Sequence, residues 1–214
     1  MDQTEQFLQA LTDAHGVPGY EAEVRAVLRS YMEPLGEVTQ DKLGSLVCHV
    51  PGDGPKVMLV GHMDEIGFIT THVTDDGFVK FLQLGGWWDQ VLLGQRVLIK
   101  TRRGGVLGVI GAKPPHLLPA DERAKLVEKK DMYIDIGATS RAEVEAASVR
   151  LGDPIVPDSR FAVLANPKAY LAKAFDNRVG CAVVIDVLRG LKDAPHPNDL
   201  YAVQTVMEEV GLRG

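Results

Sequence analysis

Three segments of the chain space their apolar side chains three or four positions apart. These segments are residues 4–14, residues 21–32 and residues 178–191. This spacing places the apolar side chains on one face of a helix and therefore predicts three amphipathic helices. Thr4 is the expected N-cap of the first helix, and Gly36 is the glycine expected to close the second.

Continuous apolar runs predict strands that are buried in a sheet. Residues 57–60 form one such run, which breaks at Gly61. Residues 200–207 form a second, near-continuous run of the kind that is buried on both faces of a parallel sheet. Shorter strands are expected at residues 37–40 and 45–50. Helices that alternate with such strands indicate an α/β fold.

The pattern changes between residue 67 and about residue 136. Short β-forming runs alternate there with glycine-rich turns, and no long helical pattern intervenes, which predicts a small barrel or sandwich. The charged residues 120–130 are expected to form a surface loop or helix. We therefore expect one α/β domain made of residues 1–67 and 161–214, interrupted by a β-rich insert of residues 68–160.

The composition excludes several classes of function. The formal net charge is −6, and no basic cluster is interleaved with aromatic residues, which argues against nucleic acid or an anionic membrane as the main partner. The first residues lack the features of a signal peptide, and no apolar run approaches the ~20 residues that span a bilayer. Cys48 and Cys181 form no CxxC pair, so we expect buried thiols in a reducing compartment. These features predict a cytoplasmic protein.

An imidazole and two carboxylates follow the predicted strand at residues 57–60. His62, Asp64 and Glu65 come directly after its end, and open α/β sheets place ligand sites just beyond the carboxyl ends of their strands. In a metal site, His62 would supply a neutral nitrogen and Asp64 would hold the other ring N–H. Alternatively, Asp64 and Glu65 are turn residues and His62 is a hydrogen-bonded histidine at the rim. This stretch alone supports both interpretations equally.

Carboxylates also stand at two other element ends. Asp176 precedes a predicted helix and could serve only as its N-cap. Glu208 and Glu209 follow the predicted strand at residues 200–207 and could be a solvated pair. Adjacent carboxylates at the end of a buried strand repel each other, however, so the pKa of one should rise unless a cation neutralises them. A metal bound by Glu209 would remove this repulsion and leave Glu208 free as a general base toward water.

Five stretches that contain most of these candidates occur together and in one order. They are GHMDEIGF at 61–68, GAKPPHL at 111–117, YIDIGA at 133–138, AFDNRVGC at 174–181 and MEEVGLRG at 207–214. With them, the sequence resembles the tetrahedral glutamyl/leucyl aminopeptidase family, a family of two-metal peptidases of which some members are labelled endoglucanase or cellulase. The resemblance covers the whole chain, and residues 16–21 (GVPGYE) are similar to the family's opening motif.

The resemblance implies a role for each candidate residue. His62 would bind one metal, Asp176 would bridge both, and Glu209 would bind the second. Glu208 would be the general base, and Asp64 would support the histidine. The implied cofactors are two divalent ions per subunit, zinc or cobalt, and the implied activity is release of N-terminal residues from short peptides.

The resemblance also implies an architecture. The family fold is a three-layer α/β/α metallopeptidase domain interrupted by a β-rich, barrel-like insert that is used in subunit assembly. The implied assembly is a dimer that builds into a dodecamer with its active sites facing an inner cavity.

One departure from the family pattern lies at the end of the sequence. In the family, a further aspartate and a histidine downstream of the double glutamate complete the metal sites, and this sequence stops at Gly214, before either. Two protein ligands per ion remain, fewer than the usual three. We therefore expect the N-terminal part of a longer enzyme. The alternatives are a catalytically incompetent fragment that keeps the fold and assembly surface, and a glycan hydrolase, which usually needs a carboxylate pair without metal.

Overall fold

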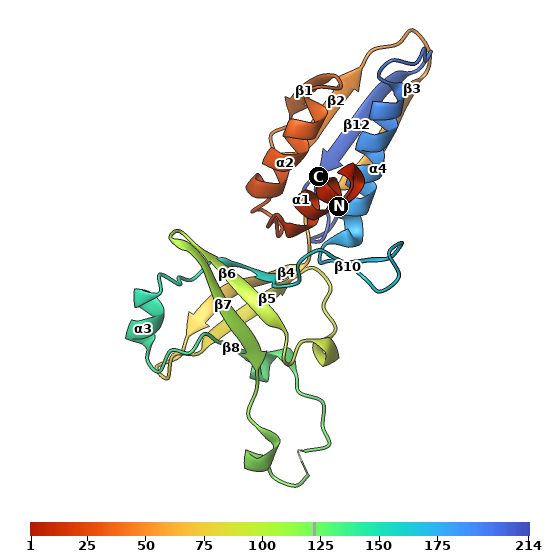
Figure 1. Ribbon diagram of the computed structural model, residues 1–214. Coiled ribbons are helices and arrows are strands. Elements are labelled where there is room, and N and C mark those ends of the chain that lie inside the picture. The colour runs from red at the N-terminus through yellow and green to blue at the C-terminus, as the bar shows by residue number, and fades with distance from the viewer. Residues whose placement is uncertain (122) are drawn as a thin grey trace. The chain divides into compact units, whose positions relative to one another are not determined.

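The computed structural model describes residues 1–121 and 123–214, and its chain forms two compact units. The first unit comprises Met1–Glu65 and Ser159–Gly214, and the second comprises Ile66–Asp158. The first is an α/β unit and the second contains a closed barrel (Figure 1). The α/β class with a barrel-like insert is therefore confirmed.

A four-stranded sheet forms the centre of the first unit. Its strand order is β1-β2-β12-β3, in which β12 runs parallel to β3 and antiparallel to β2. A short hairpin of β10 and β11 belongs to the same unit. The strands are β1 (Glu37–Gln40), β2 (Leu46–Val50), β3 (Lys56–His62), β12 (Asp199–Thr205), β10 (Ala162–Val163) and β11 (Tyr170–Leu171).

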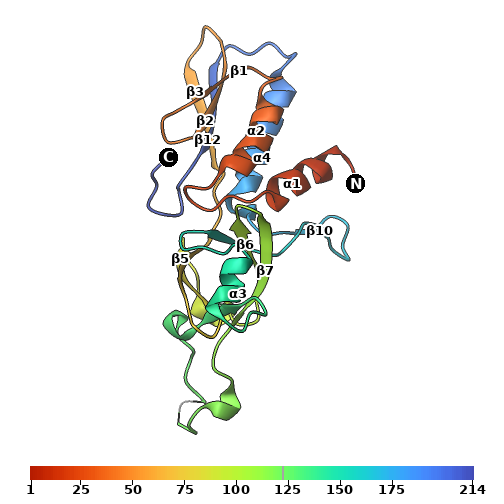
Figure 2. The same ribbon diagram turned by 90° about the vertical axis from the view of Figure 1, so that its left-hand side faces the viewer.

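Three helices lie on one face of this sheet, as the edge-on view shows (Figure 2). They are α1 (Gln3–Asp13), α2 (Ala22–Met32) and α4 (Phe175–Leu191). Burial therefore alternates along each strand. In β12, Leu200 and Ala202 are buried in the core and Tyr201 between them is only partly buried. In β3, Met58 and Val60 are 64% and 51% exposed, whereas Leu59 between them is partly buried. Residues 57–60 and 200–205 do form strands as expected, but the expected burial, on both faces for the second strand, is wrong because the helices cover one face.

Two predicted helix ends differ from the observed ones. Helix α1 begins after Asp2, not Thr4, because Asp2 forms a reciprocal capping box with Glu5 that satisfies two backbone amides. Helix α2 ends at Met32 with Glu33 as its C-cap, so Gly36 does not close it. A Cβ at Gly36 would lie 2.6 Å from the carbonyl oxygen of His49, so the glycine permits close packing against β2.

A second glycine brings β3 against the backbone of α4. A Cβ at Gly61 would lie 2.7 Å from the backbone nitrogen of Cys181 and 2.9 Å from the carbonyl carbon of Gly180. Only a residue without a side chain fits there. This close approach brings His62, the next residue of β3, near the start of α4.

The second unit is a closed six-stranded barrel with strand order β4-β5-β8-β7-β6-β9. Apolar side chains from these strands fill it, and helix α3 (Arg141–Ala146) begins after Ser140, whose hydroxyl accepts from the amide of Glu143 as expected. The strands are β4 (Gly67–Val73), β5 (Val79–Leu84), β6 (Arg96–Thr101), β7 (Gly104–Gly111), β8 (Tyr133–Asp135) and β9 (Pro154–Pro157).

The segment at residues 120–130 contains turns and the start of a short 3-10 helix, η3 (Lys129–Asp131), apart from residue 122, which lies outside the described residues. Two further 3-10 helices are η1 (Asp89–Val91) and η2 (Pro115–Leu117). Among the residues that the structure describes, none of the helices has the length and apolar character needed to cross a bilayer.

Candidate metal centre

The candidate residues gather at one edge of the sheet because β3 and β12 are parallel. Thr205 of β12 lies opposite His62 of β3, and the amide of Met63 donates to the carbonyl oxygen of Thr205 at 2.8 Å. The chain therefore leaves both strands at the same edge. His62 thus comes close to Glu208 and Glu209, which follow β12.

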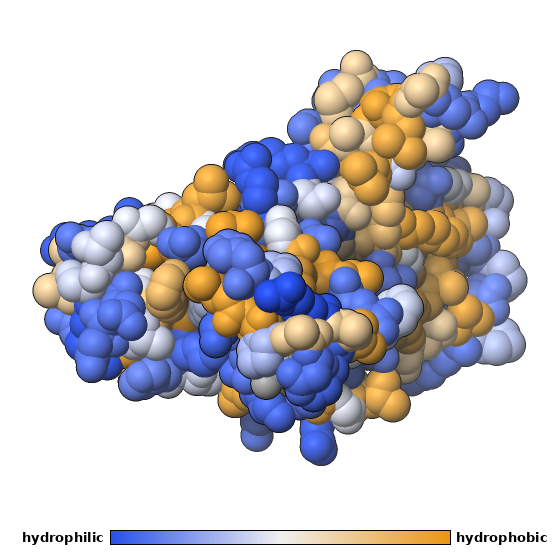
Figure 3. Space-filling model, turned by 90° about the horizontal axis from the view of Figure 1, so that it is seen from below, coloured by the Kyte–Doolittle hydropathy of each residue, from blue (hydrophilic) through white to orange (hydrophobic). Residues whose placement is uncertain are grey.

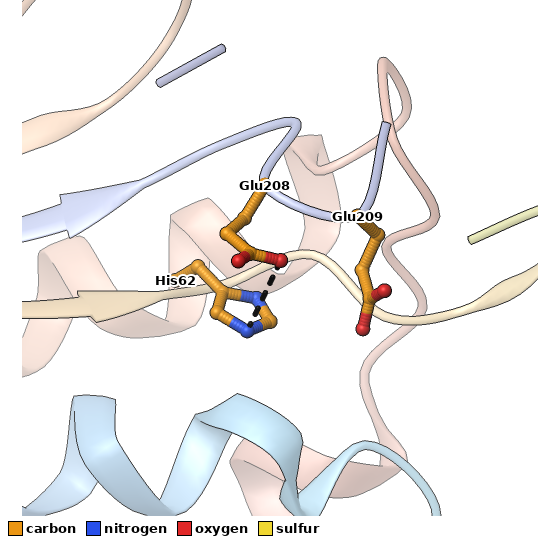
Figure 4. Close-up of side chains that lie close together, drawn as sticks. All are labelled: His62, Glu208 and Glu209. Carbon is orange, nitrogen blue, oxygen red and sulfur yellow. Dashed lines mark ion pairs between the residues drawn. The ribbon is translucent and has the colours of Figure 1, made fainter. Parts of the chain in front are cut away.

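The two ring nitrogens of His62 face different partners. Its Nδ1 lies 3.2 Å from the backbone oxygen of Asp64 and 3.4 Å from the Oδ1 of the same residue. Its Nε2 lies 3.1 Å from Oδ1 of Asp176 and 3.8 Å from Oε2 of Glu208. Figure 4 shows the Glu208 carboxylate above the imidazole, with Glu209 at the next position of the same loop. Nε2 is therefore the nitrogen that is available to a metal, while Nδ1 is held by Asp64.

The charges around His62 favour its protonated form. Burial alone would lower the pKa of the imidazole, but the carboxylates of Asp64, Glu208 and Asp176 together raise it to about 9. A metal ligand must be a neutral imidazole. A cation that binds at Nε2 would therefore take the place of a proton at neutral pH.

Asp64 links the two loops of the site. Its side chain is fully buried, and it accepts from the amides of Glu208 and Glu209 at 3.1 and 3.0 Å. Burial would raise the pKa of this carboxyl, but hydrogen bonds from His62 and from the two amides lower it. Asp64 therefore stays ionised and holds both the imidazole and the double-glutamate backbone.

Glu208 and Glu209 complete a group of possible ligands. One atom each from His62, Glu208 and Glu209 lie within 4.8 Å of one another. The pKa of Glu209 is raised by burial and by the neighbouring carboxylates of Glu208, Asp176 and Asp64, although His62 lowers it. A cation at this place would stabilise the ionised form of Glu209. The donor set of imidazole nitrogen and carboxylate oxygen suits zinc, cobalt or manganese.

Asp176 enters from the first turn of α4. Its side chain is 88% exposed, and its backbone angles are not helical. The N-cap of α4 is Ala174, so the alternative role of Asp176 as a simple N-cap is wrong. A peptide bond in the cis form joins Asp176 to Asn177. All five sequence-predicted residues, His62, Asp64, Asp176, Glu208 and Glu209, thus lie together, while their roles remain predictions.

Glu65 does not belong to this group, contrary to the sequence interpretation. Its carboxylate turns into the protein interior, where Lys173 Nζ lies 2.7 and 2.8 Å from its two oxygens and Arg178 Nη2 lies 3.1 Å from Oε1. The amide of Gly16 also donates to Oε1 at 3.1 Å. A buried carboxylate needs such partners. Glu65 therefore stabilises the fold beneath the site.

Arg178 connects this buried cluster to the site, although no pattern in the sequence predicted a role for it. It is fully buried and donates to the carbonyl oxygens of Met63 at 3.0 Å and Leu11 at 2.7 Å. The only sequence signal is its place in the AFDNRVGC stretch, two residues after Asp176. Arg178 thus joins the start of α4 to the end of β3, between His62 and Asp64.

Comparisons with known proteins agree with the motif analysis. A family model described as M42 glutamyl aminopeptidase matches residues 44–214, and a model described as AMPT matches residues 2–28. FrvX of Escherichia coli strain K12 is 44% identical over 211 residues, which are 98% of this chain and 58% of FrvX. The crystal structure of a TET aminopeptidase from the marine sediment archaeon Thaumarchaeota archaeon has a TM-score of 0.97 and 49% identity, and the match covers 100% of this chain and 61% of that one. The resemblance inferred from the motifs is confirmed.

A third relative bears on assembly and length. The TET1 peptidase of Pyrococcus horikoshii, which can assemble into a tetrahedron or a large octahedral shell, matches with a TM-score of 0.89 and 32% identity over 99% of this chain and 63% of its own. The chain thus spans about three fifths of the length of the relatives it matches.

Proposed function

The chain belongs to the M42 glutamyl aminopeptidase family, and from this premise we propose that the protein is a metal-dependent aminopeptidase. Its substrates would be short peptides, from which it releases N-terminal residues. The observation that carries the proposal is the convergence of His62, Glu208 and Glu209, whose ligand atoms lie within 4.8 Å of one another. Asp176 adds a fourth potential ligand, 3.1 Å from His62.

Two divalent ions, zinc or cobalt, would be held by His62, Asp176 and Glu209. His62 would contribute Nε2 to one ion and Glu209 a carboxylate oxygen to the other, with Asp176 shared between them. Support comes from the orientation of the imidazole, whose Nδ1 faces Asp64 and whose Nε2 faces the carboxylates. When bound, such ions polarise a scissile carbonyl and lower the pKa of water.

Glu208 would act as the general base. Its carboxylate would take a proton from the attacking water and deliver it to the leaving amine. Asp64 would keep this carboxylate in place by accepting the backbone amide of Glu208 at 3.1 Å. Asp64 would also keep His62 oriented through Nδ1. It would thus hold both the general base, Glu208, and the metal ligand, His62, in place.

Peptide hydrolysis fits this site better than glycan hydrolysis. A glycosidase usually places two carboxyl groups on opposite sides of the scissile bond, without metal. Here one carboxylate oxygen each of Glu208 and Glu209 lies within 4.8 Å of the other and of a ring nitrogen of His62, so both carboxylates belong to one cluster of possible ligands. Assays on aminoacyl anilides and on cellulose oligomers distinguish the two substrates, and hydrolysis of only the oligomers would contradict the proposal.

Self-association is the second part of the proposal: dimers that build into a dodecamer in the cytoplasm. The assembly of the Pyrococcus horikoshii relative supports it. The barrel unit carries large apolar side chains at its surface, and Figure 3 shows apolar side chains interspersed with hydrophilic ones. Exposed apolar side chains indicate an interface where they form a contiguous patch, so the assembly of the relative is the main support for this part of the proposal. The most exposed in this unit are Leu82, Trp88, Leu107, Leu117, Leu126 and Leu151.

Replacement of Glu208 tests the proposed mechanism. Glu208→Gln keeps the size of the side chain but removes its basicity, so turnover of leucyl or glutamyl anilides should fall by roughly 100-fold or more while zinc content stays unchanged. Glu37→Gln, an exposed glutamate on β1, is the matched control and should match the wild type. Undiminished activity in Glu208→Gln would contradict the role of Glu208 as general base. Metal binding without activity in the wild-type chain would favour the incompetent fragment.

A further inference from the structure

Two buried carboxylates hold three consecutive backbone amides after β12. The amide of Met207 donates to Oε1 of Glu21 at 3.2 Å. The amides of Glu208 and Glu209 donate to the two oxygens of Asp64 at 3.1 and 3.0 Å. The backbone of residues 207–209 is therefore held from two sides, and Glu21 supplies the side that the proposed mechanism does not use.

The side chain of Glu21 serves this loop and not its own helix. Glu21 is the N-cap residue of α2, yet its carboxylate makes no capping hydrogen bond to that helix. It is only 3% exposed, and Oε1 also accepts from the amide of Gly19 at 2.8 Å. Burying a carboxylate is costly unless it gains specific partners. Besides Gly19, the buried carboxylate of Glu21 has a partner far away in the sequence, the amide of Met207.

The backbone at Met207 needs such a partner. Its φ is +53°, a left-handed conformation that residues with a side chain rarely adopt, because Cβ comes too close to the following carbonyl oxygen. Gly19 lies close by, since a Cβ built there would be 3.5 Å from Cε of Met207. The turn before α2 therefore packs on the very residue whose strained conformation turns the chain from β12 toward Glu208.

We propose that Glu21 is a positioning residue, which fixes the backbone at Met207 and thereby aims the carboxylates of Glu208 and Glu209. The inference rests on the proposed function, because these glutamates are its general base and its ligand to one metal ion. Loss of this hydrogen bond would let residue 207 relax toward ordinary backbone angles. Glu208 and Glu209 would shift with it, whereas His62 on β3 and Asp176 on α4 would stay.

Two substitutions separate the reach of the side chain from its charge. Glu21→Gln loses the charge but keeps an oxygen at the same distance from the backbone. Glu21→Asp keeps the charge and is a good N-cap, but its shorter side chain cannot reach Met207. Activity should therefore follow reach: Glu21→Gln should stay within about 3-fold of wild-type kcat, and Glu21→Asp should lose roughly 10- to 100-fold. Glu37→Gln and Glu37→Asp on β1 are the matched controls.

The experiment measures three quantities on the purified protein with zinc or cobalt added. These are kcat and KM on an aminoacyl anilide, the number of bound ions, and hydrogen exchange of the Met207 amide followed by NMR. In Glu21→Asp we expect a lower kcat with little change in KM, weaker binding of one ion only, and faster exchange at Met207. In Glu21→Gln all three should resemble the wild type.

The reverse order, with Glu21→Gln impaired and Glu21→Asp normal, would overturn the inference, because charge and not position would then matter. Unchanged exchange at Met207 in Glu21→Asp would also overturn it. Failure of the proposed function looks different, since the wild type would then bind no metal or hydrolyse no peptide. The exchange measurement needs neither metal nor turnover, so it still decides the role of Glu21 in that case.

Discussion

Removal of the negative charge of Glu65 is the most informative perturbation of the fold. Glu65→Gln is nearly isosteric and keeps an oxygen for the amide of Gly16, but it leaves two buried cations without a carboxylate. Lys173 and Arg178 are 8% and 0% exposed, and both contact Glu65 within 3.1 Å. We therefore expect a large loss of stability in the first unit.

The size of the loss can be bounded in two ways. Removing one partner of a buried ion pair typically costs about 3–5 kcal/mol. Lys173 can instead give up its proton, which at pH 7 costs about 1.4 kcal/mol from the pKa of about 8 that this lysine has in the folded protein. Burial already lowers the pKa of Lys173 to about 8, and Glu65 opposes this effect. Without Glu65 the pKa falls further, so neutral Lys173 limits the loss, and about 3 kcal/mol is expected.

Urea unfolding measures this loss separately in the two units. Far-UV circular dichroism follows mainly α1, α2 and α4 of the first unit, whereas Trp87 and Trp88 both lie in the second unit and report it by fluorescence. Glu65→Gln should lower the midpoint of the helical transition. The control Asp75→Asn breaks an exposed ion pair with Arg141 and should cost less than about 1 kcal/mol.

A loss for Glu65→Gln that is no larger than the loss for Asp75→Asn would contradict this expectation, because the buried cations would then not depend on this carboxylate. A loss of the expected size would show that the charge cluster beneath the site stabilises the end of β3, where His62 lies.

Two further predictions concern titration and thiol reactivity. Because the pKa of His62 is raised from 6.5 to about 9, its charged form stabilises the metal-free protein below about pH 6.5, and this contribution is lost as the pH rises through 9. An ion that binds at His62 at pH 7 should therefore release about one proton. Titration calorimetry in two buffers of different ionisation enthalpy measures this release, and an equal heat of binding in both buffers would contradict the prediction. Cys48 and Cys181 are fully buried, and burial raises the pKa of Cys181 to about 12. Both thiols should resist Ellman's reagent in the native protein and react in urea, and rapid native labelling would contradict the described packing.

The sequence predicted the site better than it predicted which faces of the elements are buried. His62 and Asp64 could be recognised because they stand together at the end of an apolar strand. Glu65 was wrongly grouped with them, since adjacent side chains point in different directions and its partner Lys173 lies 108 residues away. The pairing of Glu21 with Met207 spans 186 residues. Such contacts depend on the folded arrangement and leave no local pattern.

The fold could be predicted at the level of elements and their order. Apolar periodicity located the helices and strands within a few residues, while their ends depended on side-chain hydrogen bonds such as the capping box of Asp2 and Glu5. Burial was expected for the apolar run at residues 57–60, and burial on both faces for the run at residues 200–207. It depends on which elements cover the sheet, and the helices lie on one face (Figure 2).

The proposed two-metal site can be located by diffraction. Anomalous diffraction at the zinc absorption edge, from crystals of the protein grown with zinc, gives the positions of bound metal without an activity assay. We predict a peak about 2.0–2.2 Å from Nε2 of His62 and from a carboxylate oxygen of Asp176, with a second peak at Glu209. Anomalous density only at other side chains, with none at His62, would contradict the proposed site.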